Sequence, residues 1–362
     1  MVLLFDKRQS IASPALAPGQ EAFEPAEPIE LTIGLVNNMP DSALKATERQ
    51  FARLLSGAAG RARINFHCFS LPSVSRSAAA RAHIDREYTD ISDLGQLRID
   101  GLIVTGAEPN GCTLPQETLW RELTDIIDWA KTNTRSTIWS CLAAHAAVLH
   151  LDGIERHRLP AKCSGIQLCT KLSEDWLMRG LRGWLKVPHS RLNEVRESEL
   201  IARGYQVLSR SDAAGVDIFA KQFQSRFIFF QGHPEYDALS LQREYMRDLA
   251  RYLAGERDDY PAIPANYFDA ASEAQLKAFE VRAKTRRDPT LAAELPGLTL
   301  RMICPASVRC RMITRRSPVV GGAIVAVYAS AAPSRRNSAG TGSILRGMWT
   351  SAPTPRSKRG SA

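Results

Sequence analysis

A cysteine stands where an expected strand gives way to an expected helix. Residues 136–140 are β-branched and aromatic, which is typical of a strand, and residues 142–150 are rich in alanine, which is typical of a helix. Cys141 between them would lie at the positive end of the helix, where a thiolate is favoured. The backbone N–H of Leu142 would point to where an oxyanion forms in acyl transfer. The pattern predicts a nucleophile, and a buried, unreactive cysteine is the alternative for this segment alone.

A histidine and a glutamate follow a second apolar strand candidate, residues 226–230. His233 is suited to act as general base toward Cys141, and Glu235 to hold the imidazole in one tautomer and stabilise its cation. Their two-residue spacing lets both side chains point to one side of an extended segment. A loop histidine by itself is more often only solvated. Together with the cysteine, the pattern predicts a Cys141-His233-Glu235 triad.

These residues need a scaffold that brings strand ends together, and the chain alternates strand and helix patterns in the way that βαβ units do. We therefore expect an α/β fold with a mostly parallel sheet flanked by helices and a site at the carboxyl ends of its strands. Expected strands are 31–37, 63–69, 99–104, 136–140, 186–188, 205–209, 216–220 and 226–230, and expected helices are 43–55, 119–131, 142–150, 239–254 and 270–284.

Composition divides the chain into four parts. Residues 1–30 hold several prolines and are expected to be an irregular extension, residues 31–270 the α/β domain, and residues 271–296 a C-terminal helical segment. Residues 297–362 are expected to be a basic tail of low order, because residues 301–362 contain ten arginines and one lysine but no acidic residue. A frame-shifted reading of the gene is the alternative explanation for that tail.

Charge and cysteine content exclude several classes of protein. The formal charge is +9, but without residues 301–362 the chain holds 36 basic and 38 acidic residues, so the body offers no basic surface for nucleic acid. Seven cysteines without a C-x-x-C pair argue against a disulfide scaffold or a metal site. No apolar run approaches the ~20 residues that span a bilayer, and no secretory signal is evident. We expect a cytoplasmic protein with no nucleic-acid or membrane partner.

Cys141 followed at a distance by His-Pro-Glu resembles the class I glutamine amidotransferase-like superfamily, which has a flavodoxin-like fold. Amidotransferases usually flank the cysteine with glycines, and Trp139 and Ala143 stand there instead. Separated motifs are similar to one branch, the homoserine O-acyltransferases of the O-succinyltransferase type. Those motifs are residues 38–40 with 47–48, 100–107 with Trp120, 161–165, 188–191, 232–237, 244–248 and 266–268, in the order of that family.

The resemblance implies transfer of an acyl group from acyl-coenzyme A to the γ-hydroxyl of L-homoserine in methionine biosynthesis, by a ping-pong reaction through an acyl-cysteine. By matching motif, Arg247 corresponds to the residue that holds the homoserine carboxylate, a task suited to a guanidinium. Lys162 and Ser190 correspond to two further substrate-contacting positions. Each has a structural alternative: an ion pair with Asp248 or Glu244 for Arg247, a solvated lysine, and a turn-forming serine.

Two departures bear on the acyl donor. Where the family has a lysine or other basic pair after Met-Pro, Asp41 follows Pro40 here, and Lys45 is the nearest candidate to polarise the acyl carbonyl. At the position where glycine admits succinate and glutamate blocks it, the chain has Asn110, which is smaller than glutamate and uncharged. We expect succinyl-CoA as co-substrate, with acetyl-CoA as the alternative, and no bound cofactor.

Other interpretations stay open at this point. The chain could be a glutamine amidotransferase-like hydrolase or a catalytically silent relative that binds a metabolite, and a homodimer is one of its open oligomeric states. His145 lies one helical turn after Cys141, where it could line the pocket or belong to the core. Cys163 and Cys169 are expected to be packing residues.

Overall fold

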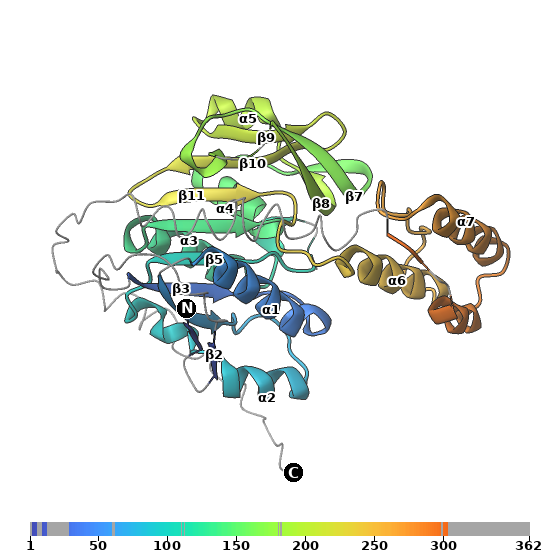
Figure 1. Cartoon of the computed structure of the whole chain (residues 1–362), viewed down its shortest axis with the longest axis horizontal. Coiled ribbons are helices and arrows are strands. Elements are labelled where there is room, and N and C mark those ends of the chain that lie inside the picture. The colour runs from blue at the N-terminus through green and yellow to red at the C-terminus, as the bar shows by residue number, and fades with distance from the viewer. Residues whose placement is uncertain are drawn as a thin grey trace, which may run out of the picture.

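The computed structural model describes residues 2–5, 9–12, 29–59, 62–109, 111, 113–179, 181, 183–297 and 300–302. Its centre is an eleven-stranded sheet with the order β2-β1-β4-β3-β5-β6-β11-β10-β9-β7-β8 (Figure 1). The predicted basic tail lies outside the described residues from 303 onward. None of the described helices has the length and apolar character needed to cross a bilayer.

The central part of the sheet is parallel, as the sequence predicts. It consists of β3 (Glu30–Val36), β4 (Arg63–Phe69), β5 (Gly101–Val104), β6 (Ser136–Ser140) and β11 (Arg226–Phe230). Strands β5 and β6 are buried throughout. Burial on both faces explains the apolar Leu102–Val104 run of β5, whereas β6 also buries Ser136, Thr137 and Ser140.

Helices cover both faces of this parallel part. They are α1 (Asp41–Ala58), α2 (Ala78–Glu87), α3 (Trp120–Asn133) and α4 (Leu142–Asp152). Alternate strand residues face different layers: Ile138 packs in one core cluster with Phe51 of α1, and Trp139 packs in the other with Ile126 of α3 and Val148 of α4. This two-sided covering is the α/β architecture that the strand-helix alternation predicts.

The other end of the sheet is antiparallel and was not anticipated. It contains β10 (Gly215–Gln222), β9 (Gln206–Ser211), β7 (His157–Lys171) and β8 (Trp184–Glu194), with the short helix α5 (Glu197–Ala202) before β9. The long strand β7 escaped prediction because its burial alternates only near its end and its pairing with β8 shifts register between Arg158 and Cys163. The prediction of a mostly parallel sheet therefore holds for the centre, and half of the pairings are antiparallel.

Two strands lie in the segment predicted to be irregular. β1 (Val2–Phe5) pairs parallel with β4, and β2 (Gln9–Ala12) pairs antiparallel with β1. Four-residue strands are too short to show a reliable alternation in the sequence, so the sequence did not predict these two.

A third core cluster lies beside the sheet. Helix α6 (Ser240–Leu253) packs with α7 (Ala270–Thr285), as Figure 1 shows at the right, and Leu249 and Phe279 are fully buried between them. The remaining elements are the 3-10 helices η1 (Ile91–Gly95), η2 (Leu114–Gln116), η3 (Trp176–Met178) and η4 (Pro289–Gly297). Since α6 and α7 share one core, the predicted boundary at residue 270 falls within a packed unit.

Candidate active site

Cys141 forms a sharp corner between β6 and α4. Its φ of 52° and ψ of −114° are unusual for a residue other than glycine, and such conformations persist where the surroundings hold them. The Cys141 N–H donates to the carbonyl of Phe230 at 2.8 Å, which ties the corner to β11. Gly106 packs so closely that a β-carbon there would lie 3.2 Å from the nitrogen of Leu142 and 3.3 Å from Cβ of Cys141. The corner therefore depends on a glycine in the loop after β5.

His233 reaches this corner because β11 runs parallel beside β6, with Phe230 in register with Ser140. The imidazole lines the same cavity as Cys141, whose sulfur raises the pKa of His233, and its Nδ1 lies 2.9 Å from Oε1 of Glu235. His233 is 6% exposed and Glu235 7% exposed, so both are shielded from water. The structure thus brings together the three residues predicted from separate segments.

Further contacts fix the histidine ring. The backbone N–H of His233 donates to the carbonyl of Pro188 at 2.7 Å, and its ring stacks on Tyr236 with centroids 4.3 Å apart. Burial by itself would lower the pKa of His233. The carboxylate of Glu235 and the hydrogen bond with Cys141 oppose burial and raise that pKa well above its ordinary value. The electrostatics therefore favour an imidazolium that can stabilise a cysteine thiolate.

Cys141 and His233 open into a cavity of about 740 Å³. Lys162 from β7, Ser190 from β8 and Arg247 from α6 line the same cavity, as does Leu142. The structure thus brings together the three residues expected to contact substrate, although they come from elements that are far apart in the chain.

The two residues expected to act on the acyl group are placed differently. Lys45 is exposed on α1 and is not among the residues that line the cavity. The structure therefore does not bring Lys45 to the site, because the turn of helix that carries it presents that position to solvent. Asn110 lies outside the described residues.

Carboxylates that the sequence reasoning did not count as site residues pair with the three residues expected to contact substrate. Lys162 Nζ lies 2.8 Å from Asp248 Oδ2, and Arg247 Nη2 lies 3.1 Å from Asp248 Oδ1. Ser190 and Tyr236 both donate hydrogen bonds to Glu244. Glu244 and Asp248 lie four residues apart on α6, a spacing that places them on one helix face and could have pointed to them.

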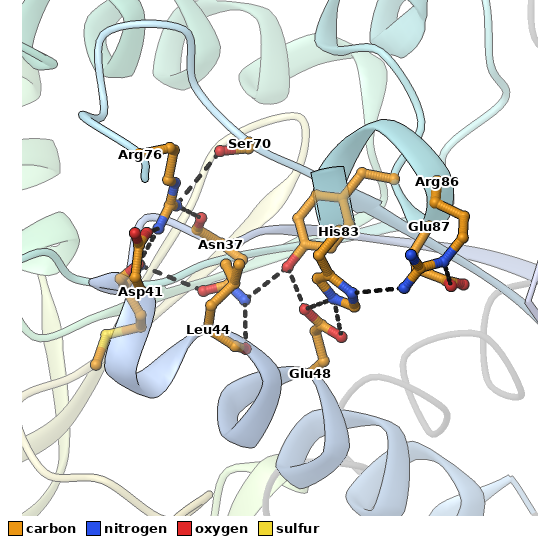
Figure 2. A network of polar contacts seen from close by, with 11 residues as sticks. Asn37, Asp41, Leu44, Glu48, Ser70, Arg76, His83, Arg86 and Glu87 are labelled. Atoms are coloured by element: carbon orange, nitrogen blue, oxygen red, sulfur yellow. Dashed lines mark hydrogen bonds and ion pairs between the residues drawn. The ribbon is translucent and has the colours of Figure 1, made fainter. Parts of the chain in front are cut away.

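The turn after β3 brings Met39 and Pro40 to the cavity wall, and a buried arginine shapes it (Figure 2). Arg76 donates to the carbonyls of Asn37 at 2.9 Å and Met39 at 2.5 Å. Arg76 also lies 3.3 Å from Asp41, the residue that stands where the family has a basic one. Asp41 is therefore a counter-ion for Arg76, and Arg76 in turn stabilises the turn through its bonds to the two carbonyls.

Behind the turn, side chains link α1 to α2 and the residue after it (Figure 2). Asn37 Nδ2 donates to the hydroxyl of Tyr88 at 3.0 Å, and that hydroxyl donates to Glu48 at 2.7 Å. Glu48 also contacts His83 Nε2 at 2.9 Å. This network explains why the Thr47-Glu48 motif accompanies the Asn-Met-Pro motif in the sequence.

His145 lines the cavity one turn after Cys141, but its side chain is buried and hydrogen-bonded within the protein. Its Nε2 lies 3.0 Å from Oε1 of Gln231, and Gln231 also accepts from the N–H of Val195. Burial lowers the pKa of His145 to about 4, so its ring is neutral at pH 7. A neutral, anchored imidazole supports the wall and is not a second base.

Cys169, His189 and Asp217 form a buried group whose possible ligand atoms all lie within 4.8 Å of one another. Arg191 Nε donates to His189 Nδ1 at 3.4 Å, which places the proton of the neutral ring on Nε2, 3.4 Å from Asp217. A metal would need Nε2 without its proton, so the contacts favour a hydrogen-bonded group. Burial raises the pKa of Cys169 far above its ordinary value, which keeps it an unreactive thiol, as the sequence predicts.

Comparison with known proteins decides the family. The family model described as homoserine O-succinyltransferase matches residues 17–286. The chain belongs to the homoserine O-succinyltransferase family. It is 62% identical over 316 residues to a homoserine O-succinyltransferase of Bradyrhizobium japonicum, covering 87% of this chain and 97% of the relative. It is 57% identical over 307 residues to one of Rhodopseudomonas palustris, covering 83% and 92% of the two chains.

Membership of the homoserine O-succinyltransferase family confirms the prediction of an acyltransferase of amino-acid biosynthesis. Solved structures similar to the chain include a glutamine amidotransferase of Methylobacillus flagellatus, with a TM-score of 0.44, 17% identity, and coverage of 76% of this chain and 97% of the other. Another is a glutamine amidotransferase of Thermotoga maritima, with a TM-score of 0.42, 11% identity, and coverage of 82% and 96%.

Proposed function

We propose that the chain transfers the succinyl group of succinyl-CoA to the γ-hydroxyl of L-homoserine through an acyl-enzyme on Cys141. The observation that carries this proposal is that Cys141 and His233 line one cavity while Glu235 lies 2.9 Å behind the His233 ring, in a member of the homoserine O-succinyltransferase family. The CoA ester is a co-substrate, and no step needs a bound cofactor.

In the first half-reaction the Cys141 thiolate attacks the thioester carbonyl and forms a new carbon–sulfur bond. The N–H of Leu142, at the start of α4, is proposed to stabilise the oxyanion. The bond to the CoA sulfur then breaks, and the His233 imidazolium supplies the proton that this sulfur takes up. Glu235 stabilises the imidazolium before transfer and holds the neutral ring in the correct tautomer afterwards.

In the second half-reaction His233 removes the proton of the homoserine γ-hydroxyl as its oxygen attacks the acyl-cysteine. The ester forms and Cys141 leaves as a thiolate, which restores the starting ion pair. A thioester and an ester have comparable acyl-transfer potential, so the demand on the site is to exclude water. The burial of His233 and Glu235 meets that demand on the protein side.

The α6 side of the cavity suits an amino acid. Arg247 is proposed to hold the homoserine carboxylate, and the carboxylates of Glu244 and Asp248 lie beside it and suit the ammonium group. Lys162 and Ser190 bridge to these carboxylates and are proposed to order them around the substrate. A cavity wall that carries both positive and negative side chains complements the zwitterion of homoserine better than it complements a neutral alcohol.

Incubation with succinyl-CoA in the absence of homoserine tests the proposal. We expect an added mass of one succinyl group on the peptide that contains Cys141, and its loss when homoserine is added. Cys141→Ala should abolish both labelling and turnover while the fold is retained. Turnover by that variant would remove the nucleophile assignment, and ammonia release from glutamine without acylation would favour a hydrolase.

A cytoplasmic location and a homodimer stay predictions. The co-substrate implies a compartment that contains CoA esters, and the helices described contain no candidate membrane span.

A further inference from the structure

The cations that line the cavity fall into two groups. On the α6 side each cation already faces a carboxylate: Lys162 and Arg247 pair with Asp248, and Arg251 lies 2.5 Å from Glu108. Arg257 is also within 3.5 Å of Asp248. This side of the cavity is therefore close to electrically balanced before substrate binds.

The opposite side, where β7 begins, is not balanced. Arg156, one residue before β7, and Arg158 within it both line the cavity, and within the part of the chain that the structure describes neither makes an ion pair or a hydrogen bond. Arg156 is half-buried and Arg158 is exposed. Among the described residues, the carboxylate of Glu117 is the charge that most raises the pKa of Arg156, but it makes no direct ion pair with the guanidinium. A guanidinium that is partly removed from water without a direct ion pair is costly, and a bound anion reduces that cost.

Arg156 lines the same cavity as Cys141 and His233. Burial lowers the pKa of Arg156, while Glu117 and, more weakly, Cys141 raise it. Arg156 in turn adds to the lowering of the pKa of His145, where burial is the largest cause. The guanidinium and the nucleophile therefore face the same cavity.

We propose that Arg156 binds the free carboxylate of the succinyl group and thereby selects a succinyl donor over a neutral acyl donor. This inference rests on the proposed function. The carboxylate carbon of an extended succinyl group lies only roughly 4 Å from the thioester carbonyl carbon, given bonds of about 1.5 Å. Its receptor must therefore be a cation close to Cys141, and a planar guanidinium can bind a carboxylate with two hydrogen bonds.

The other cavity arginines fit this task less well. Arg247 is already assigned to the homoserine carboxylate, and Arg251 and Arg257 already contact Glu108 and Asp248. Arg191 is buried and donates to the carbonyls of Asn193 and Ala214, so these guanidinium donors are already used within the protein.

Single-turnover acylation of Cys141 with two donors tests the inference. Succinyl-CoA carries the carboxylate, and butyryl-CoA replaces it by a methyl group at nearly the same length. For Arg156→Met we expect the acylation rate with succinyl-CoA to fall by about 10- to 100-fold, the range for loss of a charge-assisted hydrogen bond. The rate with butyryl-CoA should change less than about threefold by the same reasoning. Arg156→Lys should recover part of the succinyl rate, because it keeps the charge but loses the fork of donors.

Arg158→Met is the matched control, since it removes the other unpaired arginine two residues further along β7. It should change both rates by one common factor, so the ratio of succinyl to butyryl stays that of the native chain. Retained butyryl acylation by Arg156→Met shows that the variant is folded. An equal loss with both donors, or no loss with either, would overturn this inference alone. Failure of the native chain to be acylated by succinyl-CoA would overturn the proposed function, and this inference with it.

Discussion

Replacing Glu235 by glutamine is the sharpest test of how the triad operates. The substitution removes a negative charge 2.9 Å from Nδ1 of His233 and keeps the size of the side chain and a carbonyl oxygen that can accept the same hydrogen bond. Because burial lowers the pKa of His233 and Glu235 is the main group that raises it, we expect this pKa to fall in the variant. The imidazolium that partners the Cys141 thiolate then becomes less populated at pH 7.

The size of the effect follows from the geometry. Two unit charges 2.9 Å apart interact by about 6 kcal/mol at an effective dielectric constant of about 20. At about 1.4 kcal/mol per tenfold change in rate, this sets an upper limit of about 10⁴-fold on the loss. The glutamine oxygen keeps part of the orientation, so we expect acylation by succinyl-CoA to slow by about 10³-fold at pH 7.

Two measurements check this expectation. Single-turnover acylation gives the rate, and titration of the His233 ring by NMR reports its pKa, which should be lower in the variant because the carboxylate that raises it is gone. Glu199→Gln is the matched control, because Glu199 faces Nε2 of His157 at 2.8 Å in a more exposed pair and does not line the cavity. A Glu235→Gln enzyme with the native acylation rate and an unchanged pKa of His233 would refute the reasoning.

Three further substitutions probe the frame of the site. A β-carbon at Gly232 would lie 2.6 Å from Val187 Cγ1 and 2.7 Å from Asp217 Oδ1, so Gly232→Ala should lower the free energy of unfolding by about 1–3 kcal/mol in denaturant titration; an unchanged midpoint would contradict this packing. Gly106→Ala crowds the nitrogen of Leu142, and we expect slower acylation with little change in succinyl-CoA affinity; a native rate would show that the corner tolerates a methyl group. Lys45→Ala should leave kcat/KM within about twofold, since surface substitutions are usually near neutral, and a large loss would mean that Lys45 reaches the site after all.

Local patterns sufficed to place the three residues predicted to form the triad. β6 has the predicted bounds, 136–140, and α4 begins at the predicted residue, because the β-branched and aromatic residues of the strand contrast with the alanine-rich helix that follows. The placement of His233 also followed from sequence, since parallel strands present their carboxyl ends at one edge.

The antiparallel pair of β7 and β8 could not be predicted from local sequence patterns. It carries Lys162 and Ser190 into the cavity, but a register shift and an irregular burial pattern hide it from a period-two search. Whether a strand side chain faces the cavity depends on register, and register is set by pairing with a partner distant in sequence.

The sequence by itself thus determined the α/β scaffold and which cysteine, histidine and glutamate meet at its strand ends, because these depend on contacts within one strand-helix unit or on the general geometry of parallel sheets. Only the tertiary structure decided that Asp248 and Glu244 balance the α6 side of the cavity, that Arg156 lines the cavity of Cys141 without a direct ion pair among the described residues, and that Lys45 faces away. Those facts depend on which distant side chains meet across the cavity. No spacing along the chain encodes such a meeting, since it results from packing the whole sheet against its helices.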